Sequence, residues 1–158
     1  MNKNFWLNPT SLIIVEQVIR SYQSAFGKDL FNYPVGAISE LKLAELLFSM
    51  EYPLLAHDNS IDPCITYANA TALKLWGKCW AEMIGMPSKL TAPREEWAQR
   101  DTALKKATKI KAIQNYEGVR INSQGSRFLI KGAEIWSLLD RNDKYCGQAA
   151  TFNEWRNL

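Results

Sequence analysis

Three stretches near the C-terminal end, joined by two turn signals, constrain the fold of this chain more than any other feature. "IQNYEGVRI" and "SRFLIKGAEIWSLLD" are predicted as β-strands, and "NSQG" between them is typical of a hairpin turn. "RNDK" marks a second turn, and "YCGQAATF" after it makes a further strand. Because hairpins join neighbouring antiparallel strands, we expect an antiparallel sheet.

Shorter elements precede these strands. We expect a helix between Asn8 and Gly27, a break at "NYPVG", a second helix from about Ser39 to Met50, and a strand from Leu54 to His57. A strand and a short helix follow in "PCITYANATALKLWG", "CWAEMIG" adds another short helix, and a longer helix runs from about Arg94 to Lys109.

This order predicts the fold class. Helices that lie between the second and third strands of one sheet must cover a face of it. We therefore expect an α+β fold with a five-stranded antiparallel sheet, helices on one face, and an N-terminal helical extension. The predicted division places the extension at residues 1–52 and the sheet domain at residues 53–158.

Composition narrows the possible functions. A length of 158 residues suits one domain, and a net charge of +3 is too small to indicate nucleic-acid binding. Three cysteines without a C-x-x-C pair argue against a disulfide framework or a zinc site, which favours a cytoplasmic protein. We expect no signal peptide and no membrane contact, since the longest apolar run near the start is Leu12 to Val15.

The first predicted helix carries a wide apolar stripe. Its members recur at helical spacing, and Ile13 and Ile14 widen the stripe beyond one face. Two interpretations follow: the helix packs only on its own domain, or it also forms a homodimer with a second chain. The stripe consists of Leu12, Val15, Val18, Ile19, Tyr22 and Phe26.

Asn69 stands between a predicted strand and a predicted helix. Its side chain can accept a hydrogen bond from a free amide in the first turn of the helix that runs from Ala70 to Trp76, which is worth about 1 kcal/mol. A helix cap is the favoured interpretation, and a place in a binding site is the alternative.

Several separated motifs resemble those of a known fold. "ITYANATALKLWG…AEMIG" and "GVRINSQGSRFLIKGAEIWSLLD…YCGQAATF" resemble the PAS signature and its three closing strands. "YANATALKLW", "IGMPSKLTA" and "GQAATFNEW" are similar to the MEKHLA domain, a PAS-like domain, in its stand-alone bacterial or algal type. The resemblance covers about residues 8–155 and implies a sensory or regulatory domain.

Two cofactors of PAS domains fit the residues poorly. Flavin-binding, light-sensing members carry a reactive cysteine in G-x-N-C-R-F, whereas this chain has Pro87 and Ser88 there, and a serine supplies no thiolate. Those members also place amide side chains toward the flavin where this chain has Arg120 and Ile130. A haem needs an axial ligand, and the sole histidine, His57, is interpreted as an ordinary polar residue at a strand end. The cofactor is therefore left unknown.

A ligand pocket is still expected between sheet and helices. Strand alternation puts Phe128, Ile130, Trp136 and Leu138 on one face of their strand, with Glu134 beside them. An inward Arg120 needs a carboxylate or an anionic ligand, and the alternatives are an ion pair with Glu134, ligand contact, or simple exposure. The pocket candidates are Asn69, Trp76, Ser88, Tyr116, Arg120, Phe128, Ile130, Glu134 and Trp136.

No catalytic motif accompanies this pocket. The chain has neither a phosphate-binding glycine loop nor a paired nucleophile and base, so we do not expect an enzyme. The leading hypothesis is a sensory domain that binds a small molecule and signals through protein–protein contact. The alternative is a cofactor-free module that forms homodimers through its N-terminal helix.

Overall fold

An antiparallel sheet with the strand order β2-β1-β5-β4-β3 forms the centre of the molecule. The computed structural model describes residues 4–32 and 36–158. Its strands are β1 (Leu54–Asp58), β2 (Ile65–Ala68), β3 (Ala112–Ile121), β4 (Arg127–Leu139) and β5 (Tyr145–Thr151). The hairpins predicted at "NSQG" and "RNDK" are confirmed, because β3 pairs with β4 and β4 with β5.

One more strand, which the sequence analysis did not predict, extends the sheet. The chain leaves β5 at Phe152 and forms β6 (Glu154–Asn157), which pairs with Phe128–Lys131 at the start of β4. Because β5 pairs with Glu134–Leu139 farther along, β5 and β6 follow one another along the same side of β4.

The N-terminal part covers one face of the sheet. Helix α1 (Pro9–Phe26) is capped by Asn8 and ends at Gly27, as the sequence predicts. Its buried residues pack with Trp136 and Leu138, and α2 (Glu40–Phe48) adds Ala44 and Leu47 to the same cluster. A short 3-10 turn, η1 (Phe5–Leu7), precedes α1. The break expected at "NYPVG" falls largely outside the described residues.

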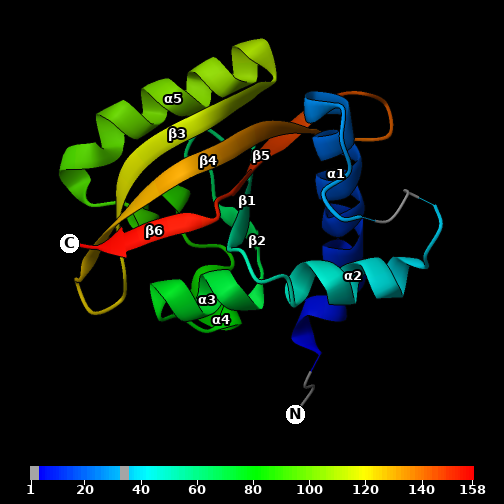
Figure 1. Cartoon of the computed structure of the whole chain (residues 1–158), viewed down its shortest axis with the longest axis horizontal. Helices are drawn as coiled ribbons and strands as arrows, with labels where there is room; N and C mark the ends of the chain where they lie inside the picture. The colour runs from blue at the N-terminus through cyan, green and yellow to red at the C-terminus, as the bar shows by residue number, and fades with distance from the viewer. Residues whose placement is uncertain (1–3, 33–35) are drawn as a thin grey trace.

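The remaining helices cover the other face (Figure 1). They are α3 (Ala70–Trp76), α4 (Trp80–Met83), the 3-10 turns η2 (Ser88–Thr91) and η3 (Arg94–Glu96), and α5 (Trp97–Ile110). A second core cluster joins Trp76 of α3 to Phe128 and Ile130 of β4. The sheet therefore has α1 on one face and α3 to α5 on the other.

Two β-bulges in the β3–β4 pair change which face of the sheet the following side chains point to. The register shifts between Ile113 and Tyr116 and again between Tyr116 and Gly118, where Gly132 on β4 has φ 63°. Phe128 and Ile130 therefore share a face with Ala133 and Ile135, toward α3 and α5. The prediction that Trp136 and Leu138 share the face of Phe128 is wrong, because the extra residue at the bulge turns both toward α1.

Candidate functional site

A small cavity, the inner cavity, lies between the sheet and the helices α3 and α5. About 50 Å³ of it is open to the centres of water-sized molecules. Since one water needs about 10–15 Å³ on this measure, the cavity has room for about three to five water-sized groups. Its wall is mostly apolar and consists of Leu55, His57, Ile65, Trp76, Thr91, Arg100, Leu104, Tyr116, Arg120, Ile130, Ala133, Ile135, Gln148, Ala149, Ala150 and Phe152.

Arg120 extends from β3 into this cavity wall and is 7% exposed. Its guanidinium stacks over the Tyr116 ring at 5.4 Å, donates to the Tyr116 hydroxyl at 3.3 Å, and donates to the Val119 carbonyl oxygen at 2.9 Å. Gly118, on the same face between them, leaves the space that both side chains fill. Within residues 4–32 and 36–158, no carboxylate pairs with Arg120.

Arg100 reaches the same cavity from α5. The guanidinium donates to the Ser88 hydroxyl at 2.9 Å, and the side chain is half-buried. Burial, followed by repulsion from the Arg120 charge, lowers the pKa of Arg100 to about 10. Because Arg120 contributes to this shift, the two guanidiniums lie near one another, and Arg100 stays protonated at neutral pH.

His57 is the third basic group of the wall. It lies on β1 and is 7% exposed, and its Nδ1 atom is 2.7 Å from the Asp58 carbonyl oxygen. Burial lowers the pKa of His57, against the opposing effect of that carbonyl, so the ring is neutral at pH 7. The nearby Gln148 side chain of β5 raises the pKa of His57 slightly against the effect of burial. It does not form a hydrogen bond with Nε2, and this atom has no partner within the described residues.

An outer cleft adjoins the inner cavity. It offers about 420 Å³ on the same measure and shares His57, Arg100, Leu104 and Gln148 with the cavity wall. The cleft lies between α5 and the loop from Asn59 to Pro63. The four shared side chains therefore separate the inner cavity from a hollow on the surface.

The candidates from the sequence fall into three groups. Trp76, Tyr116, Arg120 and Ile130 line the cavity. Ser88 lines the outer cleft and holds Arg100, while Phe128 lies behind the wall against Trp76. Asn69, Glu134 and Trp136 lie elsewhere: Asn69 caps α3, and the other two face α1.

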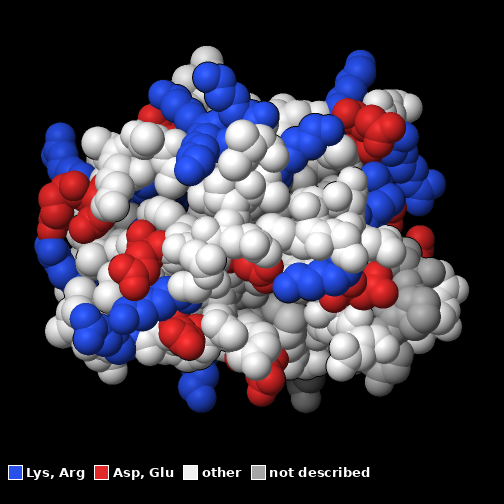
Figure 2. All heavy atoms as spheres, turned by 45° about the horizontal axis from the view of Figure 1, so that its top comes forward, with Lys and Arg blue, Asp and Glu red and all other residues white. Residues whose placement is uncertain are grey.

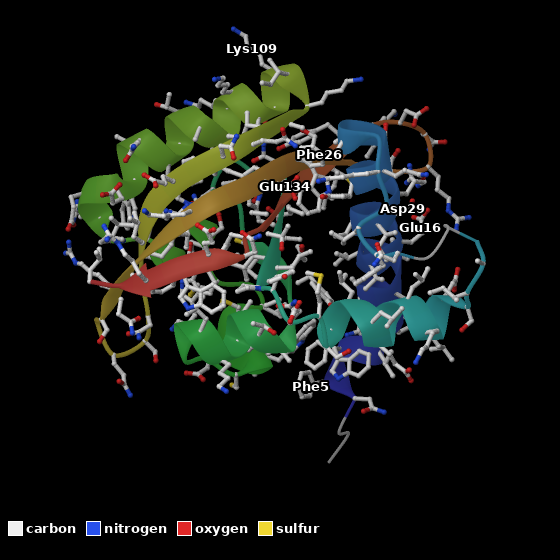
Figure 3. All side chains as sticks on the ribbon, viewed as in Figure 1. Phe5, Glu16, Phe26, Asp29, Lys109 and Glu134 are labelled. Carbon is white, nitrogen blue, oxygen red and sulfur yellow. The ribbon has the colours of Figure 1, made fainter. Side chains whose placement is uncertain are left out.

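The expected ion pair between Arg120 and Glu134 is wrong. Glu134 accepts a hydrogen bond from the Tyr22 hydroxyl at 2.8 Å and is 3.6 Å from the Lys28 amine, on the side of the sheet that carries α1. Figure 3 labels Glu134 beside Phe26 at the end of that helix. The bulge at Gly132 is the cause, because it moves Glu134 to the face opposite Arg120.

Three wall residues were missed by the sequence analysis: His57, Arg100 and Gln148. The expected place of His57 near the end of its strand is confirmed, but the side chain is buried in the cavity wall, which the sequence did not indicate. A signal for Arg100 existed, since Trp97, Arg100, Leu104 and Ala107 share one helical face of α5. By contrast, Lys105, Lys106 and Lys109 are exposed, and Lys109 points away from the body in Figure 3.

The molecular surface carries both signs of charge. Figure 2 shows basic side chains along the upper edge and elsewhere around the molecule, with acidic side chains interspersed among them, and without one broad basic face in this view. Absence of nucleic-acid contact stays a prediction. Among the described helices, none is long and apolar enough to cross a membrane. The cytoplasmic location also stays a prediction.

The sheet order and the flanking helices define a PAS-like fold of the α+β class. A PAS domain of a protein from Colwellia psychrerythraea is similar, with a TM-score of 0.64 and 13% identity over 75% of this chain and 95% of that one. The blue-light photoreceptor Vivid in its photo-excited form has a TM-score of 0.58 and 16% identity, over 87% of this chain and 94% of that one. An RNA-binding light-oxygen-voltage receptor has a TM-score of 0.63 and 14% identity, over 79% of this chain and 36% of that one.

At these identities the likeness shows the fold alone. The chain belongs to the MEKHLA domain family, whose model matches residues 12–157 and thus includes most of α1. The family resemblance stated from the sequence is therefore confirmed, while the stand-alone bacterial or algal type stays an expectation. None of the curated proteins compared with this chain matches it. Membership of this PAS-like family suggests a sensory or regulatory role.

Proposed function

We propose that this chain is a sensory domain that binds a small molecule in the inner cavity and signals through contact with another protein. One observation carries the proposal: a cavity whose wall holds Arg100, Arg120 and His57, with the Nε2 atom of His57 buried and without a partner among the described residues. Ligand sites typically combine an apolar wall with a few polar groups in this way. The proposed role is binding and not catalysis.

Strand β4 offers a direct path from the cavity to the opposite face. Ile135 lines the cavity, whereas the next residue, Trp136, donates its indole N–H to the Val18 carbonyl oxygen of α1 at 3.2 Å. Trp136 also packs edge-on against Tyr22, with 4.9 Å between the ring centroids. A ligand that moves Ile135 would therefore move α1, provided that it binds the two arrangements with different affinity.

Mass spectrometry of the full chain tests this function. The native mass of protein purified from cells is compared with its denatured mass, which exposes a ligand lost on unfolding. We expect extra mass in the native protein, or binding when small molecules are supplied. Hydrogen exchange in α1 should then change with ligand. A cavity that binds nothing would contradict the proposal.

A ligand-free homodimer through α1 is the second candidate. Ile13 is 59% exposed, in a hollow that α1 forms with Glu40 and the turn around Arg141. A native mass of two bare chains, which Ile13→Glu converts to one chain, would favour this candidate over the sensory domain. A bare single chain would contradict the homodimer, and it would contradict the sensory domain as well if no supplied small molecule binds.

A further inference from the structure

The cavity wall carries positive charge without its counterpart. Arg100 and Arg120 both line the inner cavity, and no aspartate or glutamate does so within the described residues. Neither arginine has an ion pair there. Asp62 and Asp101 in the outer cleft attract Arg100 from a distance, whereas Arg120 is only 7% exposed and no described carboxylate lies against it. A buried charge without a counter-charge costs free energy, so an anion bound at this place would stabilise the folded protein.

Both guanidiniums have spare hydrogen-bond donors. A guanidinium carries five N–H groups, and within the described part of the chain Arg120 uses one for Val119 and one for Tyr116, while Arg100 uses one for Ser88. A carboxylate accepts up to about four hydrogen bonds and matches the planar guanidinium. The remaining donors are therefore sufficient for one carboxylate between the two side chains.

His57 provides an independent sign of a ligand. The residue lines the cavity, and its Nε2 atom is buried and has no partner within the described residues. Since Nδ1 faces the Asp58 carbonyl oxygen, the neutral ring carries its proton on Nδ1 and leaves Nε2 as an acceptor. A hydroxyl group on the ligand would donate to Nε2 and satisfy it.

The remaining wall and the size of the cavity limit the rest of the ligand. Trp76, Ile130, Ala133 and Phe152 present apolar surface to it. A cavity of about 50 Å³ has room for a short carbon chain in addition to a carboxylate. Inorganic phosphate fits less well, because it has no apolar part to lie against this surface.

We propose that the inner cavity binds a small carboxylate, held by Arg100 and Arg120, with a hydroxyl directed at His57. This inference rests on the small-molecule function proposed above and adds the chemical class of the ligand. The outer cleft shares Arg100 and His57 with the cavity, so a ligand that enters from the cleft must pass between these separating side chains.

Calorimetric titration of the full chain tests the class directly. The probes are unbranched and 2-hydroxy carboxylic acids of about two or three carbons, a range set by the cavity size, together with their neutral amides and inorganic phosphate. We expect the acids to bind, the amides to bind at least about tenfold more weakly, and phosphate to bind more weakly than the acids. Arg120→Gln and Arg100→Gln should each weaken acid binding about tenfold or more. Arg156→Gln, at an exposed position on β6, is the matched control and should bind as the parent does.

The outcomes separate the two proposals. Amides or phosphate that bind as tightly as the acids, or arginine variants that bind acids normally, would overturn the carboxylate inference and leave the sensory function standing. Extra native mass from a neutral compound would do the same. If no probe binds and the native protein carries no extra mass, both proposals fail.

Stability without ligand gives a second readout that does not depend on choosing the right acid. Arg120→Met removes the unpaired charge and keeps an apolar stem, so we expect the ligand-free melting temperature to rise by about 2–5 °C. A fall of that size would mean that Arg120 stabilises the empty fold, which overturns the inference.

Discussion

Asn69 joins three elements through one buried amide. Its oxygen accepts from the Ala72 amide of α3 and from the Leu54 amide of β1, both at 3.0 Å. Its nitrogen donates to the Tyr52 carbonyl oxygen at 2.7 Å and to the Leu47 carbonyl oxygen of α2 at 3.3 Å. The helix cap predicted from the sequence is therefore confirmed, and the same side chain also holds α2 and β1 in place.

Asn69→Ala should lower the free energy of unfolding by about 2–4 kcal/mol, because it leaves buried polar groups without partners. Urea unfolding measures the change. Asn142→Ala, at an exposed turn position, is the control and should change stability by less than about 0.5 kcal/mol. Equal effects of the two substitutions would contradict a structural role for the Asn69 amide.

His57 couples stability to pH. Its pKa in the fold lies below the usual 6.5, chiefly because of burial, so the unfolded chain binds the proton more readily. The stability that comes from keeping His57 neutral is therefore fully present above about pH 6.5. As the pH falls below that value, the free energy of unfolding drops by at most about 1.4 kcal/mol per pH unit. His57→Gln should flatten this slope between about pH 5 and 7. An unchanged slope would mean that other groups cause it.

At the scale of elements, locally encoded features were predictable and long-range ones were not. The caps formed by Asn8, Asn69 and Gly27 lie within one turn of their own helices, so the residue types suffice to predict them, whereas the bonds from Asn69 to α2 and β1 were not predictable. The bulge at Gly132 depends on how β4 pairs with β3, and a one-residue slip exchanges the faces. Glu134 and Trp136 were placed in the pocket for that reason.

The close approach of β1 and β5 depends on Gly147. A Cβ atom there would overlap the His57 carbonyl oxygen, and the residue has φ 157°. Gly147→Ala must therefore separate the two strands next to His57, and we expect a loss of about 2–4 kcal/mol. Gly125→Ala is the control, because that glycine has φ 80° but open space around it, and strain alone should cost about 1 kcal/mol. Thermal unfolding compares the two, and similar losses would argue against the close approach.

At the scale of the whole molecule, the inner cavity and α1 lie on opposite faces of one sheet. The division into an extension of residues 1–52 and a sheet domain stays a prediction, but α1 buries Val15, Val18 and Tyr22 against the sheet. A helix that supplies so much of one core should unfold together with the strands beneath it. Such coupling is also what a signal from the cavity to α1 requires.

Val18→Ala tests whether α1 and the sheet form one cooperative unit. Val18 is fully buried on α1, so its truncation should cost about 1–3 kcal/mol. If the unit is cooperative, hydrogen exchange of the most protected amides should accelerate by the same factor in α1 and in β3 to β5. Ile13→Ala, on the exposed side of the same helix, should change neither the stability nor these exchange rates. Faster exchange in α1 alone would show that the helix opens independently of the sheet. A movement of Trp136 would then not be transmitted to α1 as the proposed path requires.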